Sequence, residues 1–343
     1  MQRTVLITGG AGFIGSNFVH YWTRRFPADR ILVVDALTYA GSVENLPSRG
    51  FADDRVEFWY GNVRNGELID TLMGMTDIVV HFAAESHVTR SIYDNFQFFE
   101  TDVLGTQVVA NAAVKFRPRV KRFIHVSTSE VYGTARGERM DEEHPLEPLS
   151  PYAAAKAGAD RLVYSYFKTY GVPAVIVRPF NNFGPRQHLE KLVPRFITSC
   201  LLGEPLTVHG DGLAKRDFVY VEDTCRAIDL LIHAPASAVC GEVFNIGTGR
   251  SLSIHEVADA VLDAMGLPKH PRTQVGDRPG QVFRHTANAD KIRKVVGFEP
   301  SVTFEEGLAP TTAWYRENRS WWEAQVWMRH IPIITAAGKR ELH

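Results

Sequence analysis

The chain has 343 residues, of which 45% are hydrophobic and 22% charged, and its formal net charge at pH 7 is -1. This length and composition are typical of a globular protein with one large domain or two closely joined domains. The balanced charge provides no general attraction for nucleic acid or for an anionic membrane, so we expect neither as a partner.

No targeting or metal-binding pattern is evident in the sequence. The start, MQRTVLITGG, has no apolar run or cleavage site of a signal peptide, and no stretch approaches the roughly 18 apolar residues of a membrane span. The cysteines Cys200, Cys225 and Cys240 lie far apart without the spacing of metal ligands. We therefore expect a cytoplasmic protein with reduced cysteines and no metal site.

The first predicted elements form a strand, a glycine-rich loop and a helix. Thr4–Thr8 is a short apolar run, as in a strand buried on both faces, and the helical stretch that follows ends near Arg25. Between them, Gly9, Gly12 and Gly15 are spaced three residues apart. Glycine permits the tight turn and close approach of a ligand, and the helix N-terminus supplies N–H donors, so this segment predicts a pyrophosphate-binding cradle.

The second predicted strand, Arg30–Val34, ends at Asp35, twenty residues beyond Gly15. A carboxylate at this point can accept hydrogen bonds from an adenosine ribose and would repel a 2′-phosphate. The sequence therefore predicts NAD as the cofactor, in preference to NADP.

Further strands alternate with helices along the first half of the chain. We expect strands at Val56–Tyr60, Ile78–Phe82, Val120–Val126 and Ala174–Val177, and long helices at Asn95–Phe116 and Tyr152–Tyr170. This alternation predicts an α/β fold with a Rossmann-type, doubly wound parallel sheet. The two long helices carry more apolar surface than one sheet face needs, which indicates a homodimer.

The strongest indication of catalysis lies between residues 127 and 156. Tyr152 and Lys156 are four residues apart in a helical pattern that starts at Pro151, so both should lie on one helix face. An ammonium beside a phenol favours phenolate, so we expect Lys156 to lower the pKa of Tyr152 towards that of a general base. The preceding strand delivers Thr128, Ser129 and Glu130 to its carboxyl end, where open α/β sheets bind ligands.

The pattern changes after Pro179 to loops and short elements. We expect residues 1–178 to form the cofactor-binding domain, with returning segments near 218–250. Residues 179–217 and 251–330 would form a smaller, interleaved substrate-binding lobe, and 331–343 a tail that the pattern does not assign. Phe218–Ile232 and Glu242–Ile246 are the candidates for return to the large sheet, and Ser251–Met265 is a predicted helix.

These residues resemble a known family, the extended short-chain dehydrogenase/reductases that modify nucleotide sugars. The overall resemblance is greatest to the dTDP-glucose 4,6-dehydratases. It rests on DALTYAGSVENL (35–46), HFAAESHVTRS (81–91), the Tyr152 and Lys156 pair, NNFGP and EKLVP (within 181–194), and WYRENRSWW (314–322).

The resemblance implies roles for individual residues. NAD would contact Gly9, Gly12, Phe13, Ile14, Gly15, Asp35, Asn62, Val63, Ala83, Ala84, Tyr152 and Lys156, although Asn62 replaces the usual Asp. Tyr152 would take the proton of the sugar's 4-hydroxyl, with Thr128 hydrogen-bonded to the same oxygen. The diphosphate and base of a UDP- or dTDP-sugar would be held by Asn182, Lys191, Arg216 and Arg284.

Two departures from the dTDP-glucose dehydratases favour a different reaction. Thr128-Ser129-Glu130 replaces Thr-Asp-Glu, and Gly184-Pro185-Arg186 lacks the usual aromatic after the proline; both, with GEPLTVHG (203–210), resemble UDP-glucuronate decarboxylases. A serine is a poor acid for the departing 6-hydroxyl in a dehydration. Decarboxylation needs only the 4-ketone and an oriented carboxylate, which Arg186 could bind.

The sequence therefore favours a UDP-glucuronate decarboxylase that forms a UDP-4-keto-pentose or UDP-xylose. The first alternative is a 4,6-dehydratase, since GDP-mannose 4,6-dehydratases also resemble Thr-Ser-Glu at this position. A 4-epimerase is a second alternative, against which Glu130 argues. A dinucleotide-binding protein without catalysis is a further possibility, because fold alone does not determine function.

Overall fold

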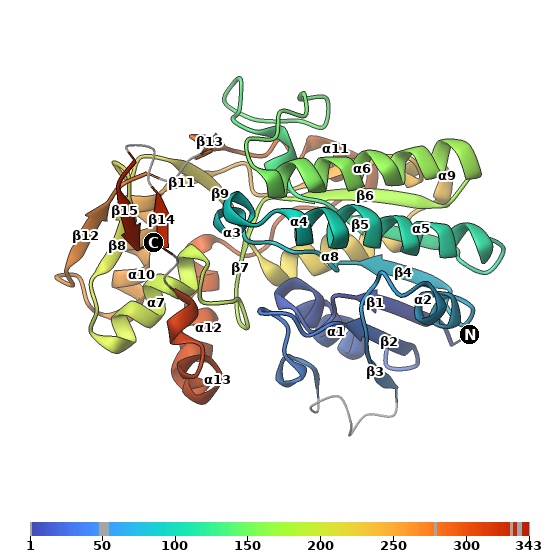
Figure 1. Cartoon of the computed structure of the whole chain (residues 1–343), viewed down its shortest axis with the longest axis horizontal. Coiled ribbons are helices and arrows are strands. Elements are labelled where there is room, and N and C mark those ends of the chain that lie inside the picture. Colours follow the sequence, from blue (N-terminus) through green and yellow to red (C-terminus); the bar gives the residue numbers. More distant parts are fainter. Residues whose placement is uncertain (1, 48–54, 278–279, 330–331, 335–337, 343) are drawn as a thin grey trace.

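A parallel seven-stranded sheet forms the larger half of the protein (Figure 1). The structure is a computed structural model, and it describes residues 2–47, 55–277, 280–329, 332–334 and 338–342. In spatial order its strands are β10 (Val243–Ile246), β6 (Ala174–Pro179), β5 (Arg122–Val126), β4 (Ile78–His81), β1 (Thr4–Thr8), β2 (Arg30–Asp35) and β3 (Val56–Tyr60). The order reverses beside β1, so the sheet is doubly wound and the predicted Rossmann-type fold is confirmed.

The central strands are apolar throughout because both faces of the sheet are covered. In β1, Val5 and Ile7 pack into one core and Leu6 into the other, as the two-residue period of a strand requires. The first core is closed by α1 (Phe13–Arg25), α8 (Val221–His233) and α11 (Asp290–Val296), and the second by α2 (Gly66–Met73), α5 (Thr106–Lys115) and α6 (Pro151–Tyr170). In Figure 1, α5 and α6 lie in front of the sheet and α8 behind it.

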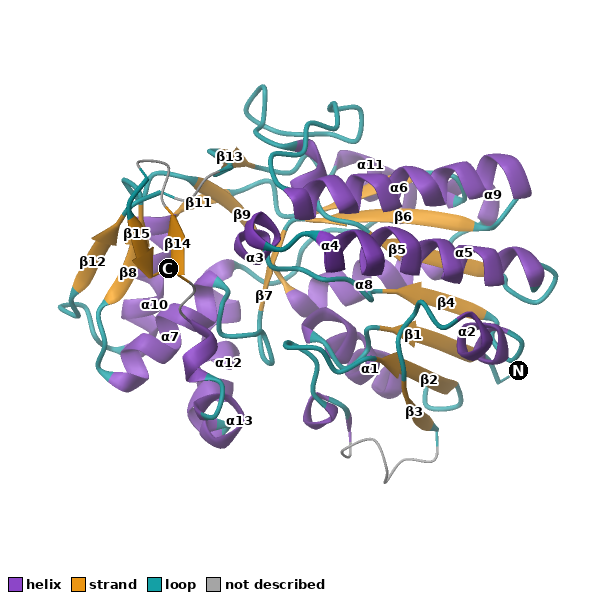
Figure 2. Ribbon diagram, viewed as in Figure 1, coloured by secondary structure: helices purple, strands orange, loops and turns teal. Residues whose placement is uncertain are grey.

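The smaller half is a lobe with a core of its own (Figure 2). Its strands are β7 (Asn181–Phe183), β8 (Leu206–His209), β9 (Lys215–Tyr220), β11 (Ser251–Ser253), β12 (Arg272–Val275), β13 (Arg284–His285), β14 (Pro332–Ile334) and β15 (Arg340–Leu342). Its main helices are α7 (Leu192–Leu202), α10 (Ile254–Met265), α12 (Phe304–Glu317) and α13 (Arg319–Glu323). Short elements elsewhere are η1 (Val43–Asn45), α3 (Val88–Tyr93), η4 (Ser129–Tyr132), α9 (Ala236–Val239) and η5 (Val326–Arg329).

Three predicted elements differ from the structure. The long helix at Asn95–Phe116 is divided into α4 (Phe96–Phe98), a π-helical segment η3 (Phe99–Gly105) and α5. Of the two segments expected to return to the large sheet, one supplies strand β10, whereas the other supplies α8, a helix packed against the sheet. Ser251–Ser253 pairs with β9 as a strand, so helix α10 starts later than predicted.

No helix in the described ranges is long and apolar enough to span a membrane. None of Cys200, Cys225 and Cys240 is in a disulfide, and Cys200 and Cys225 are buried.

The glycine loop can be tested by adding one methyl group. A Cβ at Gly15 would lie 2.3 Å from the Gly9 carbonyl oxygen, which is backbone and cannot rotate away. We expect Gly15→Ala to lower the free energy of unfolding by about 1–3 kcal/mol, as overpacking does, and to weaken NAD binding. Gly66→Ala is the control, since a Cβ there meets nothing within 4 Å. Equal stability of the two variants in urea titrations would contradict the close packing.

Candidate active site

A cavity of about 440 Å³ runs between the large sheet and the lobe. It is lined from the sheet side by the glycine loop and by the carboxyl ends of β2, β4 and β5. From the other side it is lined by residues that follow β6 and by α7, β8 and β9. The cavity therefore lies at the edge of the sheet where this fold class binds its ligands.

The glycine loop forms a cradle that a side chain would fill. Gly9 has a left-handed backbone with φ of 67°, and a Cβ there would lie 2.6 Å from the Ala83 backbone nitrogen. Helix α1 begins after Gly12 without a side-chain cap or an acidic residue in its first turn. The N-terminal N–H groups of this helix are thus not capped by a side chain of the helix itself, which suits a dinucleotide pyrophosphate.

Asp35 lies at the end of β2 beside this cradle. Its two carboxylate oxygens accept hydrogen bonds from the backbone nitrogens of Ala11 (2.9 Å) and Leu37 (2.8 Å). Burial raises the pKa of Asp35, and these hydrogen bonds oppose the rise. The other predicted cofactor residues that line the same cavity are Gly12, Phe13, Ile14, Gly15, Asn62, Val63, Ala83 and Ala84. This set fits NAD.

Tyr152 and Lys156 lie on one face of α6, as the spacing predicted. The helix begins at Pro151, and the Ser150 hydroxyl caps it by accepting a hydrogen bond from the Ala153 nitrogen (3.2 Å). Lys156 is only 3% exposed, and its ammonium donates to the Val126 carbonyl oxygen at 2.8 Å. The hydroxyl of Tyr152 is close enough to the Thr128 side chain for Thr128 to lower the Tyr152 pKa.

The expected lowering of the Tyr152 pKa is not found in this pocket. Burial raises it, the negative charges of Asp102 and Glu130 raise it further, and the Thr128 hydrogen bond opposes them. Burial also lowers the pKa of Lys156. The prediction considered only the attraction between the Lys156 ammonium and a phenolate. It left out the free-energy cost of a charged phenolate in a buried, desolvated site, which is the larger effect on the Tyr152 pKa here.

Thr128, Ser129 and Glu130 follow β5 and line the cavity together. Thr128 caps the short helix η4 by accepting a hydrogen bond from the Glu130 nitrogen (3.2 Å), and this turn aims the Glu130 side chain towards the lobe. There Glu130 Oε1 lies 3.7 Å from Nδ1 of His285. The lobe thus contributes His285, which lies next to the predicted catalytic residue Glu130.

Asp102 is a buried carboxyl group that the sequence analysis missed. It lies in the π-helical segment η3, and one carboxylate oxygen accepts a hydrogen bond from the Glu85 nitrogen at 2.8 Å. Its other oxygen has no hydrogen-bond partner among the described residues. Burial raises the pKa of Asp102 to about 8, against the attraction of the Lys156 ammonium. The sequence signal that could have indicated this buried carboxyl group is the position of Asp102 within the largely apolar segment FFETDVLGTQVV.

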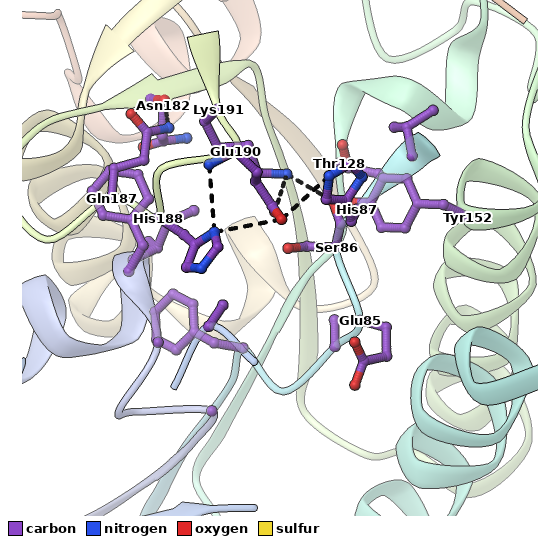
Figure 3. Close-up of a pocket in the computed structure, with 18 of the residues that line it drawn as sticks. Glu85, Ser86, His87, Thr128, Tyr152, Asn182, Gln187, His188, Glu190 and Lys191 are labelled. Atoms are coloured by element: carbon purple, nitrogen blue, oxygen red, sulfur yellow. Dashed lines mark hydrogen bonds and ion pairs between the residues drawn. The ribbon is translucent and has the colours of Figure 1, made fainter. Parts of the chain in front are cut away.

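A second missed group is Glu190, which joins the two halves across the cavity (Figure 3). Its carboxylate accepts a hydrogen bond from the Tyr39 hydroxyl (2.9 Å) and lies 3.3 Å from His87 Nε2 and 3.4 Å from His188 Nδ1. Burial alone would raise the pKa of Glu190, but the neighbouring Lys191, His87 and His188 outweigh it and lower the pKa. Glu190 is therefore an anion that holds the cavity walls together.

The predicted substrate residues divide into two groups. Asn182, Lys191 and Arg216 line the cavity, and Lys191 also donates to the Ser86 carbonyl oxygen at 2.8 Å. Arg284 and Arg186 are not among the lining residues. Arg186 instead reaches helix α1, where it donates to the Asn17 side-chain oxygen at 2.7 Å.

The placement of Arg186 corrects the argument for decarboxylation. A left-handed backbone at Arg186, with φ of 67°, turns its side chain away from the sugar end of the cavity. Two arginines that the sequence analysis did not single out, Arg195 and Arg329, line the lobe end of the cavity instead. Arg329 belongs to η5, at the end of the range 251–330 that the sequence assigned to the lobe without singling out a site residue there.

The fold and this set of residues define an NAD-dependent enzyme of the extended short-chain dehydrogenase/reductase type. A family model described as GDP-mannose 4,6 dehydratase matches residues 6–311, and the chain belongs to this family of dehydratases.

Individual relatives are similar over nearly the whole chain. The dTDP-glucose 4,6-dehydratase of Streptomyces niveus is 43% identical over 324 residues, which cover 93% of this chain and 94% of that protein. The low-salt glycan biosynthesis protein Agl12 of Haloferax volcanii is 45% identical over 312 residues, or 91% of this chain and 98% of that protein.

Solved structures show the same relationship. DesIV, a dTDP-glucose 4,6-dehydratase from Streptomyces venezuelae solved with NAD bound, has a TM-score of 0.88 and 44% identity, covering 94% of this chain and 99% of that one. A UDP-glucose 4-epimerase from Thermotoga maritima has a TM-score of 0.84 and 30% identity, covering 92% and 99%. The comparisons establish NAD as the cofactor. They favour the dehydratase alternative over the UDP-glucuronate decarboxylase, for which they give no support.

Asp102 makes the stability of the site depend on pH. In the unfolded chain the pKa of an aspartate is about 4, whereas burial in the folded protein raises the pKa of Asp102 to about 8. The stability contributed by its neutral form is therefore complete below about pH 4 and is lost as the pH rises towards 8. Asp102→Asn cannot ionise, so we expect its stability relative to the wild type to increase over this interval.

Urea titrations of both proteins across this pH interval measure the effect. Asp263→Asn, at an exposed position on α10, is the control for the loss of a negative charge. A stability difference between wild type and Asp102→Asn that stays constant with pH would rule out a buried proton on Asp102.

Proposed function

We propose that the protein is a dTDP-glucose 4,6-dehydratase, which converts the substrate to a 4-keto-6-deoxy sugar nucleotide. The observation that carries this proposal is the 43–44% identity to enzymes of that name over 93–94% of the chain, which includes both walls of the cavity. The decarboxylase loses its main structural argument because Arg186 contacts α1.

The residues present suit the first half of such a reaction. Bound NAD supplies a hydride acceptor for carbon 4, a hydride donor for carbon 6 and a positive charge that favours the phenolate of Tyr152. Tyr152 takes the proton of the 4-hydroxyl, and Thr128, which lies beside Tyr152, positions the same oxygen. Lys156, held by the Val126 carbonyl oxygen, is in place for a nicotinamide ribose.

Elimination of water follows from the acidity created by the ketone. The proton on carbon 5 lies next to the new carbonyl group, and Glu130 is the base available in the cavity to remove it. Lys191 and Arg216 offer positive charge to a diphosphate. Arg195 and Arg329 at the lobe end are placed to meet the nucleoside.

The substrate is tested by offering dTDP-glucose, UDP-glucose and UDP-glucuronate separately and recording product masses. We expect loss of water from dTDP-glucose, and Tyr152→Phe should lower its rate by roughly two to four orders of magnitude. Loss of carbon dioxide from UDP-glucuronate would restore the decarboxylase, and an unchanged rate in the Tyr152→Phe variant would exclude Tyr152 as the base. NAD binding by the variant is the control for folding.

We also propose that the protein is a homodimer. Large apolar side chains are exposed on α4 and η3, which pack against α6: Phe96 is 67%, Leu104 50% and Phe99 43% exposed. Such a face is costly in contact with water, and a second copy of the same helices would cover it.

Light scattering should give the mass of a dimer at micromolar concentration. The double variant Phe96→Asp/Leu104→Asp should shift the mass to that of a monomer, because burying two carboxylates in an interface is unfavourable. Trp327→Ser is the control, as Trp327 is also highly exposed but lies in η5. A monomeric wild type would refute the proposal.

A further inference from the structure

His285 is a fully buried histidine, and its backbone lies between strand β9 on one side and the segment around Met140 on the other. It belongs to strand β13, which pairs with β9 so that His285 is opposite Arg216. On either side of His285, the Phe283 carbonyl accepts a hydrogen bond from the Lys215 nitrogen (2.8 Å), and the Thr286 carbonyl accepts one from the Met140 nitrogen (2.8 Å). The backbone is thus anchored on both edges, and the imidazole ring has a defined place.

The hydrogen bonds of this ring determine which nitrogen carries the proton. Nε2 lies 2.6 Å from the Gly133 carbonyl oxygen, and a carbonyl can only accept, so Nε2 must carry the hydrogen. Burial lowers the pKa of His285 to about 4, against the effect of Glu130, so the ring is neutral near pH 7. A neutral ring protonated on Nε2 presents a lone pair on Nδ1.

This lone pair faces Glu130. Nδ1 lies 3.7 Å from Glu130 Oε1, and it has no hydrogen-bond partner among the described residues. An ionised carboxylate has no hydrogen to offer a lone pair, whereas a protonated carboxyl group does. The lone pair can therefore accept a hydrogen bond once Glu130 has taken up a proton, and the distance can shorten when that proton is present.

We propose that His285 is a positioning residue that lets Glu130 act first as base and then as acid in the elimination of water. The proposal rests on the proposed dehydratase function and accounts for the serine at position 129. The pair formed by Glu130 and His285 holds one proton between the two steps, so a separate acid is not required.

The proposed steps balance in atoms and charge. The Glu130 carboxylate removes the proton from carbon 5, and the electron pair of that C–H bond forms the double bond between carbons 5 and 6. As the bond from carbon 6 to oxygen breaks, the protonated Glu130 gives its proton to the departing oxygen, which leaves as water. Glu130 then returns to the carboxylate form. Nδ1 of His285 accepts a hydrogen bond from Glu130 only during the interval in which Glu130 carries the proton.

The variant His285→Gln separates this role from a structural one. A glutamine can place an N–H where Nε2 lies and keep the hydrogen bond to the Gly133 carbonyl, but it has no basic nitrogen facing Glu130. We expect oxidation at carbon 4 to persist and water loss to slow by roughly 10- to 100-fold, at the lower end of acid–base effects. KM for dTDP-glucose should stay within about twofold, because catalysis and not binding is affected.

The diagnostic readout is the species that accumulates. In single-turnover experiments with His285→Gln, near-ultraviolet absorbance should show reduced nicotinamide, and mass spectrometry should show a 4-keto hexose that has not lost water. Water loss at the wild-type rate without this accumulation would overturn the proposal. A wild type that loses no water from dTDP-glucose would instead refute the proposed function, so the two failures are distinguishable.

Two further measurements keep the proposal testable if His285→Gln folds poorly. If the residues act as a unit, the double variant Glu130→Gln/His285→Asn should be no slower in water loss than Glu130→Gln alone, and additive losses would contradict coupling. In the wild type, nitrogen NMR of labelled histidine should show His285 protonated on Nε2. A proton on Nδ1 would place a donor towards Glu130, favour its ionised form and overturn the proposal.

Discussion

The hydrogen bond from the Lys156 ammonium to the Val126 carbonyl oxygen is the contact on which the site depends. It fixes helix α6 against the carboxyl end of β5, so that Tyr152, one turn earlier, meets Thr128, which follows the same strand. A buried ammonium is costly unless it is paired and hydrogen-bonded. The Val126 carbonyl supplies the hydrogen bond, and burial lowers the pKa of Lys156 while the attraction of Asp102 opposes that lowering.

The shape of the cavity depends on a second group of charges. Glu190 comes from the segment before α7, whereas Tyr39 and His87 come from loops after β2 and β4. Figure 3 shows the contact of Glu190 with His87, which joins the lobe to the sheet across the cavity, and the Tyr39 hydroxyl donates to the same carboxylate. Because the Glu190 carboxylate is buried, its charge depends on these partners for compensation, and removing them would be destabilising. The two walls are therefore held in register by contacts within the chain itself.

Burial gives this pocket a preference for neutral groups over charged ones. It raises the pKa of Asp102 and Tyr152 and lowers that of His285 and Lys156. Groups that keep or lack a proton in this way are poised to exchange one when a substrate changes the local charge. A reaction that removes a hydroxyl proton, then a carbon-bound proton, and releases water suits such an environment.

The sequence by itself determined the large sheet, its cofactor cradle and the pairing of Tyr152 with Lys156. These features depend on contacts close along the chain, namely strand and helix periods, a glycine turn and a four-residue spacing. The tertiary structure decided that Arg186 contacts Asn17, 169 residues away, that Glu130 faces His285 from the lobe, and that Arg329 lines the cavity. Such contacts join distant segments whose relative placement is set by core packing, and burial then alters the pKa of Tyr152 in a way that spacing alone could not indicate.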